Sequence, residues 1–343
     1  MRLLRFRQRH FRNLRSSELT LAGGPLAVVG ANAQGKTNLL EALYLALGGE
    51  VRGALSERVR FGEREAQLFA EAETELGRVR FEHRFGPAGR EVKVNEAPAS
   101  LRELAEYPGA VWVRPEDTAL VLGGPEERRR WMDLLLTRFS ARYRSLLSAY
   151  ERALRQRNAL LKGQGRLAGL AAWNQKLATY GSEILQLRRR LLTRLEPLAQ
   201  EAYRELAPGT LELALRETVT PEGYLEALET HLQEELERGA TLFGPHRDDL
   251  KLLLNGLEAP QFASRGEARA IALALRLAEH RLLWTHHGEA PVLLVDDFTA
   301  ELDARRRTAL LAYAQALPQA ILTGTDPPEG LPVVHIEGGV WHT

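Results

Sequence analysis

An eight-residue run near the N-terminus has the residue types and spacing of a loop that binds the phosphates of a nucleotide. The run is Gly30-Ala31-Asn32-Ala33-Gln34-Gly35-Lys36-Thr37, that is, glycine, four residues, and then Gly-Lys-Thr. Backbone amides of such a loop can surround a β-phosphate at the start of the next helix, where the helix dipole favours anions. We expect Lys36 to bridge the β- and γ-phosphates and the Thr37 hydroxyl to bind Mg²⁺.

Two adjacent carboxylates, Asp296 and Asp297, end an apolar run far along the chain. The run Pro291–Val295 has the composition of a buried strand. Taken alone, such a run is often only a buried strand that meets solvent. Together with the phosphate loop, it predicts that Asp296 holds Mg²⁺ through water and that Asp297 polarises the attacking water.

Ser264-Arg265-Gly266-Glu267 stands at the predicted start of a long helix. The segment resembles the signature of ABC-type ATPases, in which a serine and backbone amides bind the γ-phosphate of ATP held by the other subunit. The same residues also fit a helix cap, with Ser264 as the cap and Glu267 as its capping-box partner. The two interpretations are compatible, and we expect Ser264, Gly266 and Glu267 to contact the nucleotide.

Two later segments complete the order of elements of an ABC-type head. Thr299-Ala300-Glu301-Leu302-Asp303 looks like the D-loop that crosses the dimer interface, which makes Asp303 a candidate nucleotide contact. The segment Ile321–Asp326 takes the place where these ATPases carry a residue that senses the γ-phosphate; the histidine common in transporters is absent. A site divided between two subunits would let ATP stabilise the dimer, so we expect a homodimer to form on ATP binding.

These residues must be positioned by strands and helices. Apolar runs and alternating patterns predict the strands Leu3–Phe6, Leu26–Val29, Phe69–Glu73, Arg78–Phe85, Glu91–Val94, Ala110–Val113, Pro291–Val295 and Ala320–Thr323. Helical spacing predicts the helices Asn38–Leu47, one from about Glu126 that is broken at Gly163, Leu170–Leu206, Gly266–His287 and Asp303–Leu317. Asn255-Gly256 predicts a tight hairpin after Leu250–Leu254.

The predicted fold class is α/β, an ABC-type ATPase head of mixed β-sheets flanked by helices, with an inserted and mainly helical second lobe. We expect residues 1–108 to form the first part of the ATPase lobe and residues 109–238 the helical lobe. Residues 239–343 would return to the ATPase lobe with the signature, the carboxylate strand and the D-loop. The helical stretches are too short for the long coiled-coil arms of chromosome-organising ATPases.

Five segments along the chain resemble the RecF family. They are Phe11–Leu14, Thr37–Ala42, Arg114–Asp117, Gly123–Arg130 and Gly244–Leu250. The chain departs from the family where Ala33 replaces a usual glycine and where Arg265 and Ala268 each replace a usual glutamine. Alanine tolerates fewer positive-φ conformations than glycine, so these departures bear on the strength of hydrolysis more than on binding.

The resemblance implies a cytoplasmic bacterial repair factor and a weak, DNA-dependent ATPase. RecF-like proteins dimerise with ATP, bind double-stranded DNA near single-strand gaps or junctions, and act with RecR and RecO to help load RecA. Slow hydrolysis would reset this clamp. The alternative function is the nucleotide-binding subunit of an ABC transporter, which would need a membrane partner and usually the switch histidine.

The composition is that of an ordinary globular protein, with 44% hydrophobic and 27% charged residues and a net charge of +1. The chain has no cysteine, which excludes disulfides, a thiolate nucleophile and a zinc–thiolate site. Its apolar stretches are too short to span a bilayer, and its N-terminus is too charged for a signal peptide. We therefore expect a cytosolic protein with no membrane partner.

Clusters of arginine are the candidate DNA surface, because contacts with the DNA backbone need only positive charge at about phosphate spacing. The candidates are Arg128, Arg129, Arg130, Arg138, Arg142, Arg188 and Arg189. Against this, a charged run on a helix is usually a solvated face, and neighbouring carboxylates can pair with it. We expect Arg12, in a separate basic strip, to lie near the nucleotide.

The segment Gly244–Leu250 allows two interpretations. His246 and Arg247, followed by Asp248 and Asp249, form either a functional contact or a buried polar network that holds a loop. The structural interpretation is slightly favoured.

Overall fold

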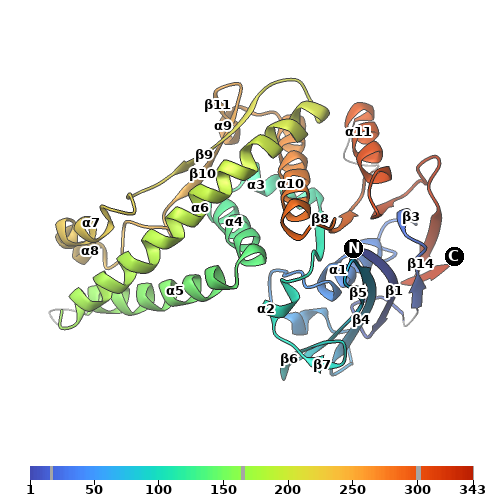
Figure 1. The fold of residues 1–343 in the computed structure, drawn as a ribbon, viewed down its shortest axis with the longest axis horizontal. Helices are drawn as coiled ribbons and strands as arrows, with labels where there is room; N and C mark the ends of the chain where they lie inside the picture. The colour runs from blue at the N-terminus through green and yellow to red at the C-terminus, as the bar shows by residue number, and fades with distance from the viewer. Residues whose placement is uncertain (16–17, 164–166, 299–302, 343) are drawn as a thin grey trace. The chain divides into compact units, whose positions relative to one another are not determined.

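The computed structural model describes residues 1–15, 18–163, 167–298 and 303–342. These residues form two compact units. The head unit consists of residues 1–118, 201–208 and 269–343, and the helical unit of residues 119–200 and 209–268. Two helices, α6 (Leu170–Leu206) and α10 (Arg265–His287), begin in the helical unit and end in the head unit (Figure 1).

The head unit contains two six-stranded sheets. The first is antiparallel, in the order β2 (Glu18–Thr20), β1 (Arg2–Arg9), β4 (Ala66–Thr74), β5 (Gly77–Gly86), β6 (Gly89–Val94) and β7 (Ala97–Pro98). The second has the order β15 (Val340–His342), β14 (Val333–Glu337), β3 (Gly24–Val29), β13 (Gln319–Gly324), β12 (Val292–Val295) and β8 (Ala110–Val113). Among the described strands of the second sheet, β15 alone is antiparallel to its neighbour.

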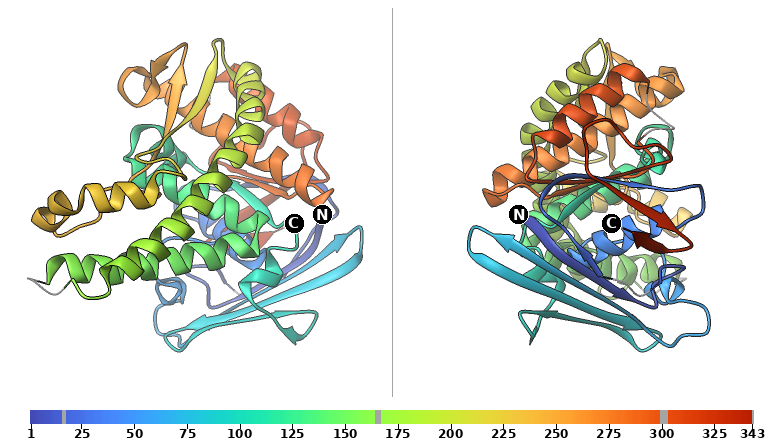
Figure 2. Two further views of the ribbon diagram at one scale, coloured as in Figure 1. Left: turned by 60° about the vertical axis from the view of Figure 1, so that its left-hand side comes forward. Right: turned by 90° about the vertical axis from the view of Figure 1, so that its right-hand side faces the viewer.

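Helix α1 (Lys36–Ala46) packs between the two sheets of the head unit, against β4 and β5 of one and β8, β12 and β13 of the other (Figure 2). Its leucines explain this position, since Leu39, Leu40 and Leu43 are all fully buried. A helix with apolar residues on more than one face must be covered on more than one face. Helix α11 (Ala304–Gln315) packs on β3 and β13. Short turns of helix fill the connections: η1 (Leu55–Arg58), α2 (Leu101–Leu104) and η2 (Pro115–Thr118).

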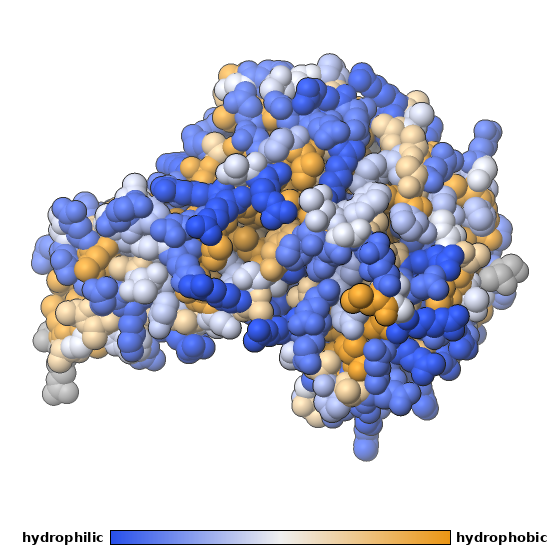
Figure 3. Space-filling view, viewed as in Figure 1, coloured by the Kyte–Doolittle hydropathy of each residue, from blue (hydrophilic) through white to orange (hydrophobic). Residues whose placement is uncertain are grey.

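The helical unit combines long helices with a small antiparallel sheet. Its elements are α3 (Ala119–Leu122), α4 (Pro125–Phe139), α5 (Ala141–Lys162), the first part of α6, α7 (Tyr224–Thr230), α8 (Leu232–Arg238), α9 (Ala259–Phe262), and the strands β9 (Leu211–Arg216), β10 (Asp249–Leu254) and β11 (Leu257–Glu258). Helices α5 and α6 lie side by side, joined by a buried hydrogen bond from Arg157 to Asn174. Mainly hydrophilic residues cover this unit on the face drawn in Figure 3.

Most predicted elements are present within a few residues, including the Asn255-Gly256 hairpin, where both residues have positive φ values of 52° and 79°. The long helix predicted from Glu126 is wrong, because it is divided at Ser140 into α4 and α5. Ser140 has φ −149° and its hydroxyl accepts a hydrogen bond from the Tyr143 amide, which is the geometry of an N-cap.

The observed units have different bounds from the predicted lobes, because the helical unit continues to residue 268 rather than 238. The sheet of β9, β10 and β11 belongs to it, and β10 packs against α4. The signature residue Ser264 therefore lies in the helical unit. Among the described residues, no helix is both long and apolar enough to cross a membrane.

Candidate nucleotide site

The phosphate loop lies between β3 and α1, as the sequence predicts. Gly35 is the N-cap of α1 and has φ 107°, in the left-handed region that glycine tolerates best. A side chain there would also meet Asn13, whose Oδ1 lies 3.0 Å from the ideal Cβ position. Ala33 adopts φ 63°, so the position where the family usually has glycine does require a left-handed conformation.

Lys36 lies at the start of α1, with its side chain folded over the loop. Its ammonium group donates hydrogen bonds to the carbonyls of Gly30 and Ala31, at 2.7 and 2.9 Å. Only 8% of the residue is exposed. A cation held at the phosphate loop in this way is placed to neutralise a bound phosphate.

The carboxylate predicted to hold the metal lies next to the loop hydroxyl predicted to bind it. Thr37 Oγ1 is 3.1 Å from Asp296 Oδ1, although 259 residues separate them in sequence. The same carboxylate oxygen accepts a hydrogen bond of 2.7 Å from Thr323. Burial raises the pKa of Asp296, and the hydroxyls of Thr323 and Thr37 act in the opposite direction by stabilising its charge.

The donor set fits Mg²⁺. Hydroxyl and carboxylate oxygens are the ligands this ion prefers, and it usually completes its shell with water and substrate phosphates. Among the described residues no group of three or more histidines, cysteines or carboxylates could hold a metal by itself. Thr37 and Asp296 would hold a Mg²⁺ whose remaining ligands are water and nucleotide phosphates, as expected for a phosphate-loop site.

Asp297 follows in an unusual backbone conformation, with φ 49°. Its amide donates to Thr323 Oγ1 at 3.0 Å, so one threonine holds both consecutive aspartates. Thr323 lies on β13, in the segment where the sequence predicts a γ-phosphate sensor. Its part in holding the carboxylates was not predicted, since a threonine in a buried strand carries no signal of its own.

Arg12 is held beside the loop helix by a buried carboxylate. Its guanidinium and that of Arg58 both pair with Glu41 on α1. Its neighbour Asn13 accepts a hydrogen bond of 2.7 Å from Asn38, the second residue after Lys36. The His10–Asn13 segment therefore lies along the start of α1, and contact between Arg12 and a nucleotide stays a prediction. Asn13 is a further residue of the site that the sequence did not single out.

The loop residue Gln34 also holds the C-terminal strands in place. Its carbonyl accepts from the Gly339 amide at 3.0 Å, and its side-chain oxygen accepts from the Gly338 amide. Ala31 and Asn32 are exposed at the tip of the loop. The structure thus assembles the whole predicted loop with both carboxylates in the head unit.

Ser264 forms the predicted capping box with Glu267. The serine hydroxyl accepts from the Glu267 amide at 3.2 Å, and the Glu267 carboxylate accepts from the Ser264 amide at 2.8 Å. Ser264 is exposed, and Gly266 occupies the first turn of α10. This geometry accounts for the cap, and contact with a nucleotide on another subunit stays a prediction.

Most of the predicted D-loop, Thr299-Ala300-Glu301-Leu302, lies outside the described residues. Asp303 is described and caps α11, since its carboxylate accepts a hydrogen bond of 2.9 Å from the Arg306 amide. The residue is exposed.

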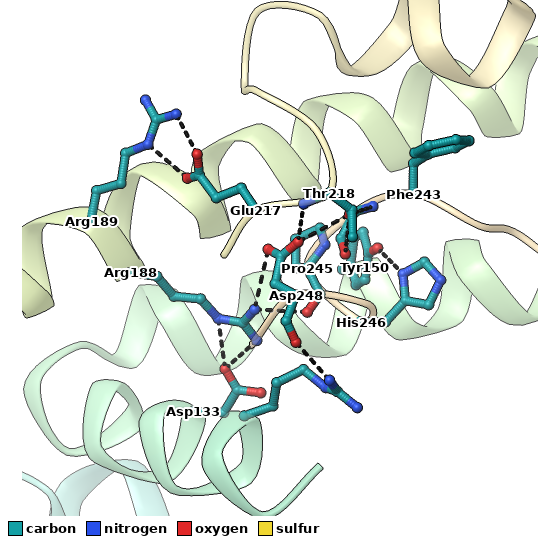
Figure 4. Close-up of polar contacts among 12 residues, drawn as sticks. Asp133, Tyr150, Arg188, Arg189, Glu217, Thr218, Phe243, Pro245, His246 and Asp248 are labelled. Carbon is teal, nitrogen blue, oxygen red and sulfur yellow. Dashed lines mark hydrogen bonds and ion pairs between the residues drawn. The ribbon is translucent and has the colours of Figure 1, made fainter. Parts of the chain in front are cut away.

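Two of the predicted DNA-contacting arginines need correction, because they are buried in ion pairs. Arg128 is 4% exposed and binds Asp249 through two hydrogen bonds of 2.8 and 3.0 Å. Arg188 is 1% exposed and pairs with Asp133 at 2.8 Å (Figure 4). A guanidinium held in the interior by a carboxylate cannot approach a phosphate.

The other candidates remain at the surface to different degrees. Arg142 and Arg189 are exposed and form ion pairs of 2.6 Å with Glu183 and Glu217. Arg129, Arg130 and Arg138 are partly buried, and Arg129 donates to the Asp248 carbonyl.

Pro245, His246 and Asp248 of the Gly244–Leu250 segment take part in a largely buried polar network, as the slightly favoured interpretation expects, whereas Arg247 is exposed (Figure 4). Asp248 is fully buried and accepts hydrogen bonds from the amide and hydroxyl of Thr218, at 2.9 and 3.0 Å. The Pro245 carbonyl accepts from Arg188, and His246 Nδ1 lies 2.6 Å from the Tyr150 hydroxyl. The His246 Nε2 faces the Thr241 carbonyl, an acceptor, so Nε2 carries the proton and Nδ1 accepts from Tyr150.

Comparison with known proteins identifies the family. The family model for the RecF/RecN/SMC N terminal domain matches residues 2–326. The chain is 47% identical over 319 residues to the DNA replication and repair protein RecF of Deinococcus radiodurans, covering 92% of this chain and 88% of that one. It is 46% identical over 323 residues to RecF of Deinococcus deserti, covering 94% and 89%.

Solved structures agree. A structure of the recombination mediator protein RecF with ATP, in the RecFOR pathway, superposes with a TM-score of 0.90 at 30% identity and covers 99% of this chain and 97% of that one. An Smc head bound to the C-winged helix domain of ScpA gives a TM-score of 0.58 at 16% identity, which shows the shared head fold alone. The phosphate loop, the carboxylate strand and these relatives lead to one conclusion: the chain belongs to the RecF family of DNA replication and repair proteins.

Proposed function

We propose that this protein is an ATP-controlled DNA clamp of recombinational repair. ATP with Mg²⁺ binds at Gly30–Thr37, and the nucleotide of one subunit meets Ser264, Gly266 and Glu267 of a second copy. Asp303 lies at the same dimer interface. Hydrolysis, with Asp296 on Mg²⁺ and Asp297 acting on water, is slow and opens the dimer.

The observation that carries this proposal is the meeting of Thr37 and Asp296 at 3.1 Å beside the Lys36 ammonium group. A phosphate loop and a metal-binding carboxylate from opposite ends of the chain have no structural need to converge on one hydroxyl. Their convergence provides hard oxygen ligands and a cation where β- and γ-phosphates would lie. The solved relatives with ATP and an ATP analogue support the choice of nucleotide.

The partner of the closed dimer is double-stranded DNA at gaps or junctions with single strands. Arg129, Arg130, Arg138, Arg142 and Arg189 supply the positive charge, with contacts to phosphates rather than bases. RecR and RecO act with the clamp to help load RecA. This part rests on the family and on its place in the RecFOR pathway.

Sedimentation tests the clamp directly. The protein is sedimented alone, with ATP–Mg²⁺, and with ATP–Mg²⁺ and a gapped duplex at two salt concentrations. A monomer that becomes a dimer only with ATP, and then binds DNA more weakly at high salt, supports the proposal. A species indifferent to ATP refutes the clamp, and a dimer that ignores DNA refutes the DNA partner.

Two substitutions separate nucleotide binding from dimerisation. Lys36→Arg should abolish hydrolysis, because the guanidinium cannot take the place of the ammonium group, and some nucleotide binding should remain. Ser264→Arg should leave ATP binding by the monomer intact and prevent the dimer. Ser148→Arg, at an exposed serine within α5, is the matched control. ATP-dependent dimerisation of the Ser264→Arg variant would show that the site is not shared.

DNA contact by a single arginine shows in the salt dependence. Arg142→Gln should reduce the slope of log K against log salt by about one, the value for one lost phosphate contact. Arg238→Gln is the control, because Arg238 is also exposed and also paired with a glutamate, Glu234. Equal slopes for the two variants would remove Arg142 from the DNA surface.

A further inference from the structure

Phe61 is a large aromatic residue whose side chain is fully exposed to solvent. Its relative exposure is 104%, against 98% for Leu76 and 64% for Phe262, the next most exposed hydrophobic residues among those described. Phe61 lies between η1 and β4 and is followed by Gly62, with φ 88°. The ring packs against no other described residue of the folded chain, so its face is accessible to a ligand.

Backbone hydrogen bonds join this segment to the residues beside the phosphate loop. The Arg12 amide donates to the Arg58 carbonyl at 2.8 Å, and the Arg60 amide donates to the His10 carbonyl at 2.7 Å. The Arg60 guanidinium also donates to the Arg12 carbonyl at 3.2 Å. Phe61 is the residue after Arg60, so it follows directly on a segment paired with His10–Arg12.

The order of strands gives the direction in which a nucleotide must extend. Strand β3, which leads into the loop, has β13 on one side and β14 on the other. Asp296 and Thr323 lie on the β13 side, and Thr37 points to them. The β- and γ-phosphates with Mg²⁺ therefore belong on that side.

The opposite side of the loop is formed by the chain around Asn13. The Arg15 amide bonds the Gly339 carbonyl at 2.8 Å, and Gly339 lies in the turn between β14 and β15. Asn13 accepts a hydrogen bond from Asn38 there, and its Oδ1 lies 3.0 Å from the ideal Cβ position of Gly35. The α-phosphate, the sugar and the base must leave the loop on this side, toward Asn13, Arg12 and the segment that carries Phe61.

We propose that Phe61 is the base-stacking residue of the nucleotide site and sets part of its affinity for adenine nucleotides. The proposal rests on nucleotide binding at Gly30–Thr37. Stacking needs only an aromatic face, so tryptophan at this position should serve as well as phenylalanine. Arg12 and Arg58 both pair with Glu41 and thereby tie both segments to α1.

The test compares two ligands that share the phosphates and differ in the base: ATP and inorganic tripolyphosphate, each with Mg²⁺. Dissociation constants are measured by calorimetry at protein concentrations where the chain is monomeric. Phe61→Ala should weaken ATP binding by about tenfold, within the 5- to 150-fold range for loss of one base–aromatic stack. The same variant should bind tripolyphosphate as the unmodified protein does.

Controls make each outcome decisive. Phe61→Trp should keep ATP affinity, and its indole fluorescence should be quenched by ATP and not by tripolyphosphate. Leu76→Ala removes an equally exposed hydrophobic side chain at the β4–β5 turn and should change neither constant. Unchanged ATP affinity in Phe61→Ala overturns the inference, including the case in which that variant only weakens dimerisation. Failure of the unmodified protein to bind either ligand would instead refute the nucleotide site itself.

Discussion

Replacing Gly244 by alanine should destabilise the helical unit by about 2 to 6 kcal/mol. The residue has φ 118°, a conformation open to glycine and strained for every other residue, with a penalty of about 1 to 3 kcal/mol. An added Cβ would lie 1.8 Å from the Tyr224 hydroxyl and 2.8 Å from that of Tyr150. Tyr224 is fully buried, so it must move and lose its hydrogen bond of 2.9 Å to the Phe243 carbonyl. An unsatisfied buried polar group adds about 1 to 3 kcal/mol.

Urea unfolding followed by circular dichroism measures this loss. Gly256→Ala is the matched control, because Gly256 also has positive φ, 79°, and nothing lies within 4 Å of its ideal Cβ position. The control should lose only about 1 kcal/mol, because alanine is strained at this φ but its methyl group meets no other atom. If Gly244→Ala is no less stable than Gly256→Ala, the close packing of Tyr224 is not the reason that position 244 requires glycine.

Three further predictions concern buried charge. Burial lowers the pKa of His246 from 6.5 to about 4. As the pH falls, the unfolded chain therefore binds a proton at this residue before the folded chain does. The part of the unfolding free energy that is present above about pH 6.5 should be lost progressively toward pH 4. His246→Gln should flatten that part of the plot of unfolding free energy against pH. Arg157→Met should lower the unfolding free energy by about 3 to 5 kcal/mol, because it leaves the fully buried Glu235 unpaired. Adding Glu235→Leu should restore part of that free energy, as measured by denaturant titration. Strictly additive losses in the double variant would contradict the pairing. Asp117→Asn should lower the melting temperature measured by calorimetry, since Asp117 accepts hydrogen bonds of 3.0 and 2.7 Å from Arg276; an unchanged midpoint would show that this pair contributes nothing net.

The elements of the phosphate site were predictable because their signals are local. Gly35 needs a positive φ, a helix with regularly spaced leucines follows it, and Pro291–Val295 is apolar throughout, whatever the rest of the chain does. That Asp296 meets Thr37 follows from the order of strands, which no single segment specifies. Thr323 was missed for this reason: its importance depends wholly on the neighbour that the sheet gives it.

The charge of a side chain was the least reliable predictor of its exposure. Arg128 and Arg188 look like their neighbours in arginine runs, but they pair with Asp249 and Asp133, which lie far from them in sequence. Helical spacing alone does not say which arginine of a triplet points inward. The break at Ser140 did have a local signal, since serine is a favoured N-cap, but a continuous apolar stripe on both sides concealed it.

The central position of β3 has a consequence for how the protein is made. Both edges of β3 are covered by strands, β13 and β14, that begin at residues 319 and 333, whereas β3 itself ends at residue 29. At about 5 to 20 residues per second, synthesis leaves this apolar strand unpaired for tens of seconds. During that time its open edges can pair with those of other nascent chains. A messenger cut short before residue 319 would therefore yield an aggregating fragment rather than a smaller working protein.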